Sequence, residues 1–227
     1  MNYLISPDHY RDVAGIRLHL RDSGPRDAPS VIFLHGFGSS LHTWEPWARS
    51  LLDKYRVVRY ELPGFGLTGP DPTGGYTDER GMAILAALMD KLSIQRASLI
   101  GNSIGGRLAW RFAARYPGRI VKLALISPDG FPSPGYEYGK VPEVTLFVRM
   151  MKYVLRRAFV RANLAPAYAY PRRLSNATVD RYYELMLAPG VRGAMISRLE
   201  QTKLEPPEPF LKSIEASTLV CGDNRIN

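Results

Sequence analysis

The sequence predicts an α/β fold, built on a mostly parallel, doubly wound sheet with a helical insertion. Three observations support this prediction. Short apolar runs alternate with amphipathic stretches up to residue 126, a glycine-rich junction surrounds Ser103, and only helix-like segments follow between residues 131 and 210. Short apolar strands that alternate with helices are typical of parallel sheets covered on both faces.

The strands are expected at six short runs, namely residues 16–20, 31–34, 57–60, 97–100, 121–126 and 218–221. The first alternates apolar and polar side chains, which predicts one face in contact with water. The others are nearly continuous apolar runs, as expected of strands buried on both faces.

Helices are expected between these strands, at residues 44–52, 77–92 and 103–116. Thr77 occupies the N-cap position of the second helix. The third helix carries an apolar face and a basic face, each at helical spacing: Ile104, Leu108 and Phe112, and Arg107, Arg111 and Arg115.

The insertion is expected to contain helices at residues 144–163, 178–187 and 191–204. We therefore divide the chain into a core (1–130), an insertion (131–210) and a return to the core (211–227). Arg149, Lys152 and Arg156 lie beside apolar residues in the first of these helices, a pattern also found in helices that rest on membranes. We interpret it instead as a helix that packs its apolar side inward and leaves its charges in water.

Composition and charge exclude several classes of protein. Hydrophobic residues make up 45% of the chain, and the single Cys221, expected to be buried, excludes a disulfide scaffold. The net charge of +9 is spread along the chain without a nucleic-acid-binding motif, so no nucleic-acid partner is expected. No run approaches the about 18 apolar residues of a membrane span, and the first residues lack a secretory signal. We predict a cytoplasmic protein.

Residues 101–105 read G-N-S-I-G and place Ser103 between an expected strand and an expected helix. In such a junction the serine lies on a tight turn that lifts its hydroxyl above the sheet, and the glycines allow the turn to close. The helix directs its first N–H groups at the place where an oxyanion would form. We predict that Ser103 is a nucleophile rather than only a helix cap.

A second glycine-rich loop, H-G-F-G at residues 35–38, follows the strand at 31–34. We predict an oxyanion hole formed by the backbone N–H groups of Phe37 and Ile104. His35 is interpreted as a residue that packs this loop, not as the base. The supporting residues are His35, Gly36, Gly38, Gly101 and Gly105.

Four segments, H-G-F-G, E-L-P-G-F-G-L-T-G-P, G-N-S-I-G-G-R and L-I-S-P-D-G-F, resemble the α/β-hydrolase fold over residues 13–221. More narrowly, they resemble its cap-bearing serine hydrolases, which include esterases and carbon–carbon bond hydrolases. The resemblance implies that residues 131–210 form a cap. It also implies hydrolysis of an ester or similar acyl bond of a small substrate through an acyl-serine, without cofactor or metal. The methionine and aromatic residues of the insertion either line a pocket for an apolar acyl group or form the core of the cap. Glu61 stands where relatives usually have aspartate and is interpreted as a loop carboxylate.

Two features depart from this family. In the family's triad, the serine comes first in the chain, then the acid, then the histidine. Here the acid is expected at Asp223, which lies one or two residues before the position where the family has it. Asp129 is a second candidate, which we interpret as a turn residue. All four histidines lie at or before residue 42, so no general base follows Ser103, and the family's last strand and closing helix are also missing. We expect a serine hydrolase without its catalytic histidine. The alternatives are a carbon–carbon bond hydrolase and a non-catalytic ligand-binding protein.

The strand at 218–221 is expected to be an exposed edge of the sheet, because no later strand follows it. Exposed edges carry unpaired backbone groups and promote association. We therefore expect marginal stability, aggregation or dimerisation through this edge, and loss of shielding at Leu123 and Leu125.

Overall fold

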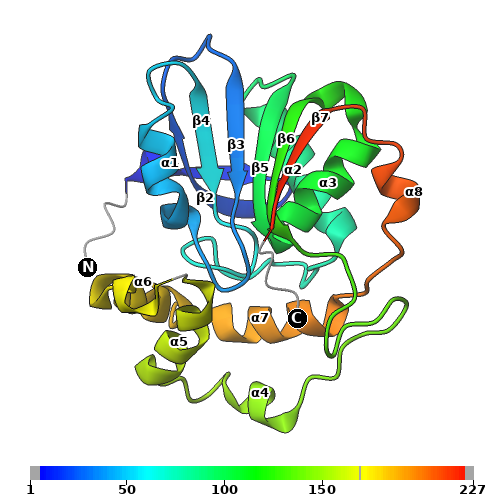
Figure 1. Cartoon of the computed structure of the whole chain (residues 1–227). Coiled ribbons are helices and arrows are strands. Elements are labelled where there is room, and N and C mark those ends of the chain that lie inside the picture. Colours follow the sequence, from blue (N-terminus) through cyan, green and yellow to red (C-terminus); the bar gives the residue numbers. More distant parts are fainter. Residues whose placement is uncertain (1–5, 169, 223–227) are drawn as a thin grey trace.

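The computed structural model describes residues 6–168 and 170–222. Within them, seven strands form one sheet in the order β1-β2-β4-β3-β5-β6-β7 (Figure 1). The strands are β1 (Tyr10–Val13), β2 (Ile16–Ser23), β3 (Ser30–Leu34), β4 (Arg56–Tyr60), β5 (Ala97–Ser103), β6 (Ile120–Pro128) and β7 (Ser217–Cys221). The pairs β1–β2 and β2–β4 are antiparallel, and every later pair is parallel. The predicted mostly parallel α/β fold is confirmed.

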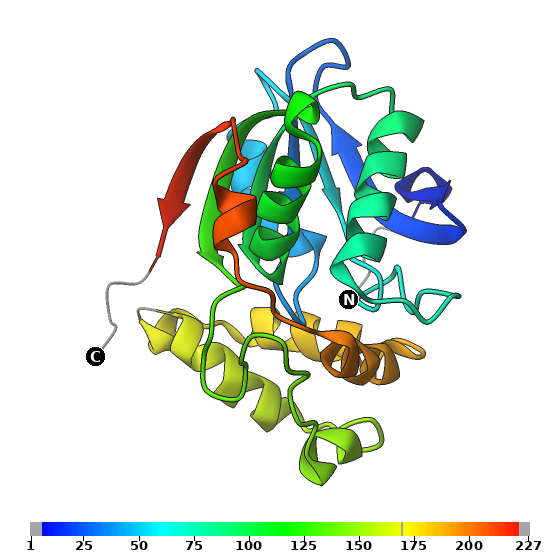
Figure 2. The same ribbon diagram turned by 90° about the vertical axis from the view of Figure 1, so that its right-hand side faces the viewer.

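Helices cover both faces of the sheet, as Figure 2 shows for the side that bears α2 (Asp78–Lys91), α3 (Ile104–Arg115) and α8 (Glu208–Leu211). Alternate residues of β3 point to opposite faces: Ile32 and Leu34 join the large core, whereas Phe33 joins a smaller one with Trp44. The smaller core lies under the 3-10 turn Leu41–Trp44 and α1 (Glu45–Arg49). Helix α2 begins as predicted, with the Thr77 Oγ1 accepting from the Arg80 N–H at 3.2 Å.

The β7 edge of the sheet is exposed, as predicted. Every residue of β7 is exposed, and 62% of Leu219 and 61% of Val220 is accessible. A groove of about 490 Å³ runs over β3, β5, β6 and β7 on the α1 side. Two predictions were wrong here. Cys221 is exposed because it belongs to this edge, and Leu123 and Leu125 stay buried because they face the large core.

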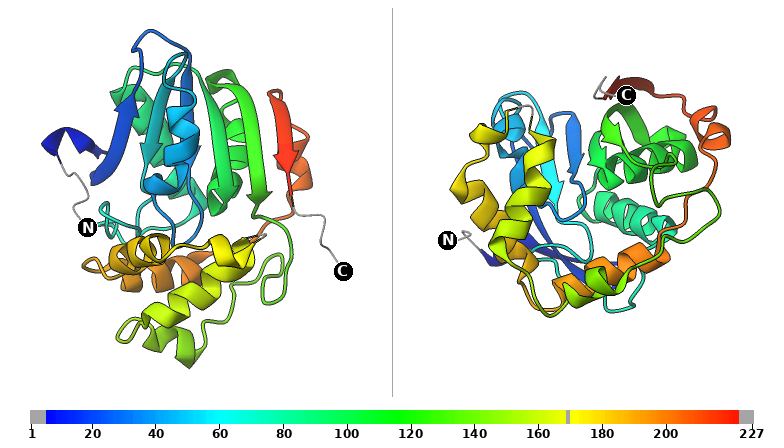
Figure 3. Two further views of the ribbon diagram at one scale, coloured as in Figure 1. Left: turned by 60° about the vertical axis from the view of Figure 1, so that its left-hand side comes forward. Right: turned by 60° about the horizontal axis from the view of Figure 1, so that its bottom comes forward.

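Of the five α-helices described between β6 and β7, the four that precede α8 are α4 (Leu146–Met150), α5 (Arg157–Leu164), α6 (Asn176–Met186) and α7 (Val191–Gln201). They extend across the end of the sheet at which the parallel strands finish (Figures 1 and 3). The single helix expected at 144–163 is wrong, because residues 151–156 separate α4 from α5. The break lets Leu155 pack with Val160, Leu174 and Val179 in a small core of its own.

In residues 6–168 and 170–222, no helix is long and apolar enough to cross a membrane.

Candidate active site

Ser103 ends β5 in a backbone conformation that serine rarely adopts, with φ 51° and ψ −120°. Such a conformation costs on the order of 1–3 kcal/mol and persists only where the surrounding structure enforces it. Backbone contact does so here. A Cβ at Gly101 would lie 2.4 Å from the Gly105 carbonyl oxygen, and a Cβ at Gly105 would lie 2.4 Å from the Leu34 carbonyl oxygen. The chain segments around Ser103 therefore pack with no room for a side chain at either glycine.

The loop at residues 35–38 lies against the serine. A Cβ at Gly36 would be 3.4 Å from the Ser103 Cβ and 2.6 Å from the Asn102 Oδ1. The Phe37 N–H has no acceptor among the described residues. Ile104 is the first residue of α3, so its N–H has no partner within the helix. The two predicted oxyanion donors thus belong to backbone segments that meet at Ser103.

His35 is fully buried, and each of its ring nitrogens forms a hydrogen bond with a backbone group. Its Nε2 accepts from the Leu62 N–H at 3.0 Å, which leaves the proton on Nδ1 to donate to the Gly36 carbonyl oxygen at 2.8 Å. Burial lowers the pKa of His35 to about 4, although the Gly36 hydrogen bond acts in the opposite direction. A neutral imidazole with both nitrogens occupied joins two loops and is not a free base.

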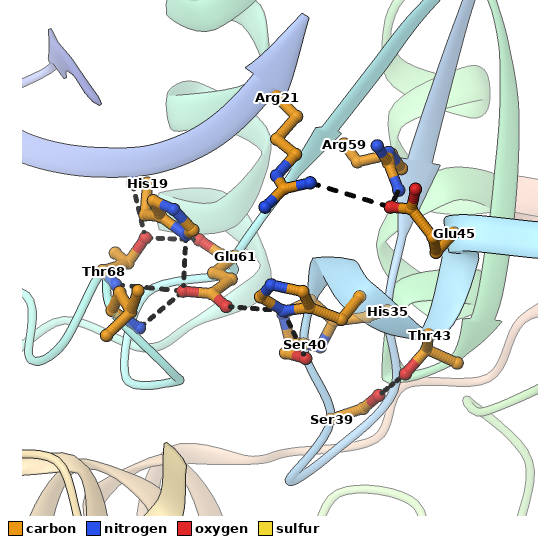
Figure 4. Close-up of polar contacts among 12 residues, drawn as sticks. His19, Arg21, His35, Ser39, Ser40, Thr43, Glu45, Arg59, Glu61 and Thr68 are labelled. Carbon is orange, nitrogen blue, oxygen red and sulfur yellow. Dashed lines mark hydrogen bonds and ion pairs between the residues drawn. The ribbon is translucent and has the colours of Figure 1, made fainter. Parts of the chain in front are cut away.

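The other histidines lie together: the ring centre of His19 is 6.1 Å from that of His9 and 6.4 Å from that of His42, and Figure 4 shows His19 beside Glu61. The His19 Nδ1 is 3.1 Å from the Glu61 Oε2, and the His42 Nδ1 is 4.0 Å from the Glu61 Oε1. Burial lowers the pKa of His42 to about 3, and nearby cations, Arg21 first, act in the same direction. His9 accepts from the Ser6 N–H at 3.3 Å.

Glu61 is a fully buried loop carboxylate, in line with its interpretation from sequence. Its Oε2 accepts from the N–H groups of Leu67 and Thr68 at 2.5 and 3.3 Å. A Cβ at Gly66 would lie 2.4 Å from the Glu61 carboxyl carbon, and Gly66 has φ +50°. Glu61 therefore organises the loop that follows β4.

In the described part of the chain, the serine hydroxyl is not hydrogen-bonded to a predicted acid. Among the described residues, none forms a hydrogen bond with the Ser103 side chain. Asp223 lies outside the described residues. The Asp129 Oδ1 accepts from the Gly130 N–H at 2.7 Å, and its Oδ2 is 3.4 Å from the Arg107 Nη1. Asp129 thus has the contacts of a turn residue.

The sequence analysis missed the arginines that connect the helices to the core. The Arg198 side chain donates to the carbonyl oxygens of Pro63 and Tyr76 at 2.8 and 3.3 Å. Burial lowers the pKa of Arg198 to about 10. Arg111, expected on a polar face, is buried and bridges to Glu205 at 2.8 Å. An arginine in a helical pattern does not indicate that its side chain is buried or which group it contacts, because both depend on residues distant in the sequence.

An apolar cavity of about 60 Å³ adjoins the loop at 35–38. Phe37 forms part of its wall, and the other lining residues come from the segment around α4, from α6 and from α7: Val148, Met151, Leu155, Met186, Arg192, Met195, Ile196 and Leu199. Gly38 has φ +66°, and a Cβ there would lie 2.7 Å from the Met186 Cε. The insertion helices therefore pack directly over the predicted oxyanion loop.

Comparison with known proteins agrees with this architecture. The sequence profile of the family described as alpha/beta hydrolase fold matches residues 29–220. The chain is 33% identical, over 184 residues, to the dihydrolipoyllysine-residue acetyltransferase component of the acetoin cleaving system of Cupriavidus necator, covering 80% of this chain and 48% of that protein. It is 30% identical, over 192 residues, to the 2-hydroxy-6-oxo-2,4-heptadienoate hydrolase of Pseudomonas putida, covering 81% and 64%.

Among solved structures, the enol-lactonase of Burkholderia xenovorans LB400 superposes with a TM-score of 0.76 at 27% identity, covering 93% of this chain and 79% of the lactonase. The chain spans about half the length of the curated relatives it matches. The strand order, the serine junction and the profile match lead to one conclusion: the chain belongs to the α/β-hydrolase fold family.

Proposed function

We propose that this chain is a serine hydrolase that cleaves an ester or similar acyl bond through an acyl-serine at Ser103. The observation that carries the proposal is the strained Ser103 backbone, held by direct contact with the glycines around it and with the loop at 35–38. Proteins keep such strain mainly where a site requires it. A cap role for residues 131–210 and a cytoplasmic location form part of the same proposal.

The proposed chemistry begins with attack of the Ser103 Oγ on the substrate carbonyl carbon. The carbonyl oxygen becomes an oxyanion, which the N–H groups of Phe37 and Ile104 stabilise. Collapse of this intermediate breaks the bond between the acyl carbon and the alkoxide oxygen, and the departing oxygen takes up the proton that the base removed from Oγ, so that an alcohol leaves. Water then hydrolyses the acyl-serine to the carboxylic acid and restores the Ser103 hydroxyl. The Oγ proton needs a base, and Asp223 is the proposed acid that would orient one.

The four histidines of the chain do not suit the role of base. His35 uses both ring nitrogens, His19 and His42 lie beside Glu61, and the His9 Nδ1 accepts from the Ser6 N–H. A serine hydrolase that lacks a triad member keeps only about 10³–10⁴-fold acceleration over water, from its oxyanion hole and substrate binding. We therefore expect the 227-residue chain to have very little activity by itself.

The proposed substrate is small and apolar at its acyl part. The apolar cavity beside Phe37 supports this proposal, as does the similarity to an enol-lactonase, whose lactone contains an acyl–oxygen bond. Relatives named as hydrolases of 2-hydroxy-6-oxo dienoates support a second candidate, carbon–carbon bond hydrolysis at the same serine. A non-catalytic ligand-binding role is the third.

The test is imidazole rescue of p-nitrophenyl ester hydrolysis. Imidazole added to the solution substitutes for the missing base, and Ser103→Ala corrects for the hydrolysis that imidazole catalyses without the serine. We expect both proteins to be equally slow without imidazole, and we expect the rate with the unsubstituted chain to exceed the Ser103→Ala rate once imidazole is added. Equal rates at every imidazole concentration would contradict the nucleophile assignment and favour the ligand-binding role. A burst without imidazole that Ser103→Ala abolishes would show that the chain supplies its own base.

The same assay separates the two hydrolase candidates. With imidazole present, an ester and a 2-hydroxy-6-oxo dienoate of similar size are compared at equal concentration. Faster Ser103-dependent consumption of the ester supports the acyl-bond proposal, whereas faster consumption of the dienoate favours the carbon–carbon candidate.

A further inference from the structure

The segment around α4 exposes an unusual concentration of large apolar side chains. We call it the α4 patch, and its members are Leu146 (75% exposed), Phe147 (64%), Met150 (55%), Tyr153 (76%) and Val154 (61%). Figure 1 shows α4 at the end of the molecule that lies farthest from the sheet. Single exposed apolar residues are ordinary, but a contiguous group marks an interaction site.

The opposite side of the same segment is already occupied. Val148, Met151 and Leu155 line the small apolar cavity against α7. The segment is thus apolar on two sides, and only one side is covered by the rest of the chain. A helix that is apolar all round is normally buried. The prediction that this segment packs its apolar side inward was therefore incomplete, because a second apolar side faces solvent.

Cations are interleaved with the α4 patch. Arg149, Lys152 and Arg156 are exposed, and the Lys152 Nζ lies 5.8 Å from the centre of the Tyr153 ring. Arg149 also pairs with Glu200 at 2.6 Å. Residues 131–210 together carry 12 basic and seven acidic side chains. An occupant of the patch must therefore offer both an apolar interior and negative charge.

We propose that the α4 patch docks onto the surface of an anionic lipid bilayer. Leucine, phenylalanine and tyrosine side chains enter the boundary between headgroups and acyl chains, while long basic side chains reach the anionic headgroups. A second copy of the chain fits less well, because a two-fold pairing of this patch would place the same cations opposite one another. Docking also brings the groove of about 690 Å³ between α4 and α7 to the headgroups; Arg149, Lys152 and Tyr153 line it.

The experiment is vesicle flotation of the 227-residue chain. One set of vesicles is phosphatidylcholine alone, and the other contains about a third phosphatidylglycerol, which gives it a negative surface. We expect the chain to float with the anionic vesicles and to remain largely free with the neutral ones. Raising the salt concentration should weaken binding, because salt screens the attraction between exposed charges.

Two variants test the two parts of the patch. The first variant removes apolar surface by combining Leu146→Ser, Phe147→Ser and Tyr153→Ser. It should lower the coefficient for partition onto the anionic vesicles by about a hundredfold or more. Lys152→Glu with Arg156→Glu removes charge. Each cation near an anionic surface contributes about fivefold, so this variant should lose at least about 25-fold on anionic vesicles. All the replaced side chains are exposed, so circular dichroism melts should match those of the unsubstituted chain.

Matched controls separate this patch from other sources of binding. Lys54→Glu with Lys212→Glu makes the same change in net charge at exposed sites outside the insertion, and Leu219→Ser with Val220→Ser removes exposed apolar surface at β7. Both should float as the unsubstituted chain does. The proposal is overturned if the chain does not bind anionic vesicles, if the α4 variants bind normally, or if the β7 variant loses binding instead. Absence of lipid binding would favour an acidic protein as the occupant.

Discussion

The junction between β5 and α3 and the helices between β6 and β7 are held together in different ways. At the junction, backbone atoms touch: Gly101 and Gly105 have carbonyl oxygens where their side chains would be. Between β6 and β7, side chains do the packing, and the small core there has only four buried members. Backbone contact admits one residue type at each position, whereas side-chain contact admits many. The junction is therefore predictable from the local sequence, whereas among the helices α6 and α7 were predicted and the break between α4 and α5 was not.

The largest expected difference between the two regions comes from one methyl group. Gly105→Ala places a Cβ 2.4 Å from the Leu34 carbonyl oxygen, and we expect it to destabilise the fold by on the order of 4 kcal/mol or more. The matched control is Gly193→Ala in α7, where the Cβ would lie 3.6 Å from the Lys152 Cε. Alanine in a helix should there stabilise by up to about 1 kcal/mol. Urea unfolding measures the change in unfolding free energy for each variant. Equal changes in the two would contradict the difference in packing between the junction and the helices.

The second prediction concerns the chemistry at the junction. Phe37→Pro removes a backbone donor, so we expect the imidazole-dependent ester hydrolysis to fall by about 10²–10³-fold. Phe37→Ala keeps the N–H and is the control; it should retain the rate within a small factor. A folded Phe37→Pro variant with near-normal rate would mean that another group stabilises the oxyanion.

The third prediction uses pH to test how firmly the loops around the junction are held. The pKa of His35 is about 4 in the folded protein and about 6.5 in an unfolded chain. Between these values the unfolded state binds a proton that the folded state excludes, so stability falls as the pH falls. From pH 7 to pH 5, His35 should contribute about 2 kcal/mol of this loss. Urea unfolding at pH 7 and at pH 5 measures the loss of unfolding free energy between the two, and this loss should be about 2 kcal/mol smaller in His35→Gln. An unchanged pH dependence in this variant would contradict the burial of His35.

The smallest expected effect is at the β7 edge, whose side chains are exposed and pack less closely than those of the serine junction. We propose weak association of two copies through this edge, because Leu219 and Val220 are largely exposed. Light scattering over a range of concentrations should show dimers or larger species, and Leu219→Lys with Val220→Lys should shift the chain to monomer. Trp47→Lys, at a residue 52% exposed on α1, is the control and should not. A monomer at every concentration would show that the exposed edge does not pair.

The sequence predicted those elements whose pattern is local. The positions of β3 and β5, the start of α2 at Thr77 and the serine junction all follow from short apolar runs, caps and glycines. The break between α4 and α5 was not predictable, because Leu155 turns inward toward partners as distant as Val179. For the same reason, no local pattern indicates that Arg111 is buried in contact with Glu205.

The site was predicted to a similar extent. The loop at 35–38 lies against Ser103, as its position after β3 led us to expect. The grouping of His19 and His42 around Glu61 was not expected, because these residues are distant in sequence and only the sheet order brings them together. The roles of Ser103, Phe37 and Ile104 remain predictions that the experiments above address.

The most direct test of the central claim is to identify the acylated residue. The chain is incubated with p-nitrophenyl acetate and imidazole, the imidazole is removed to stop deacylation, and peptides are mapped by mass spectrometry. We predict one acetyl group on the peptide that contains Ser103, and none on that peptide in Ser103→Ala. Acetyl groups found only elsewhere, or equally in both proteins, would contradict the assignment of Ser103 as the nucleophile.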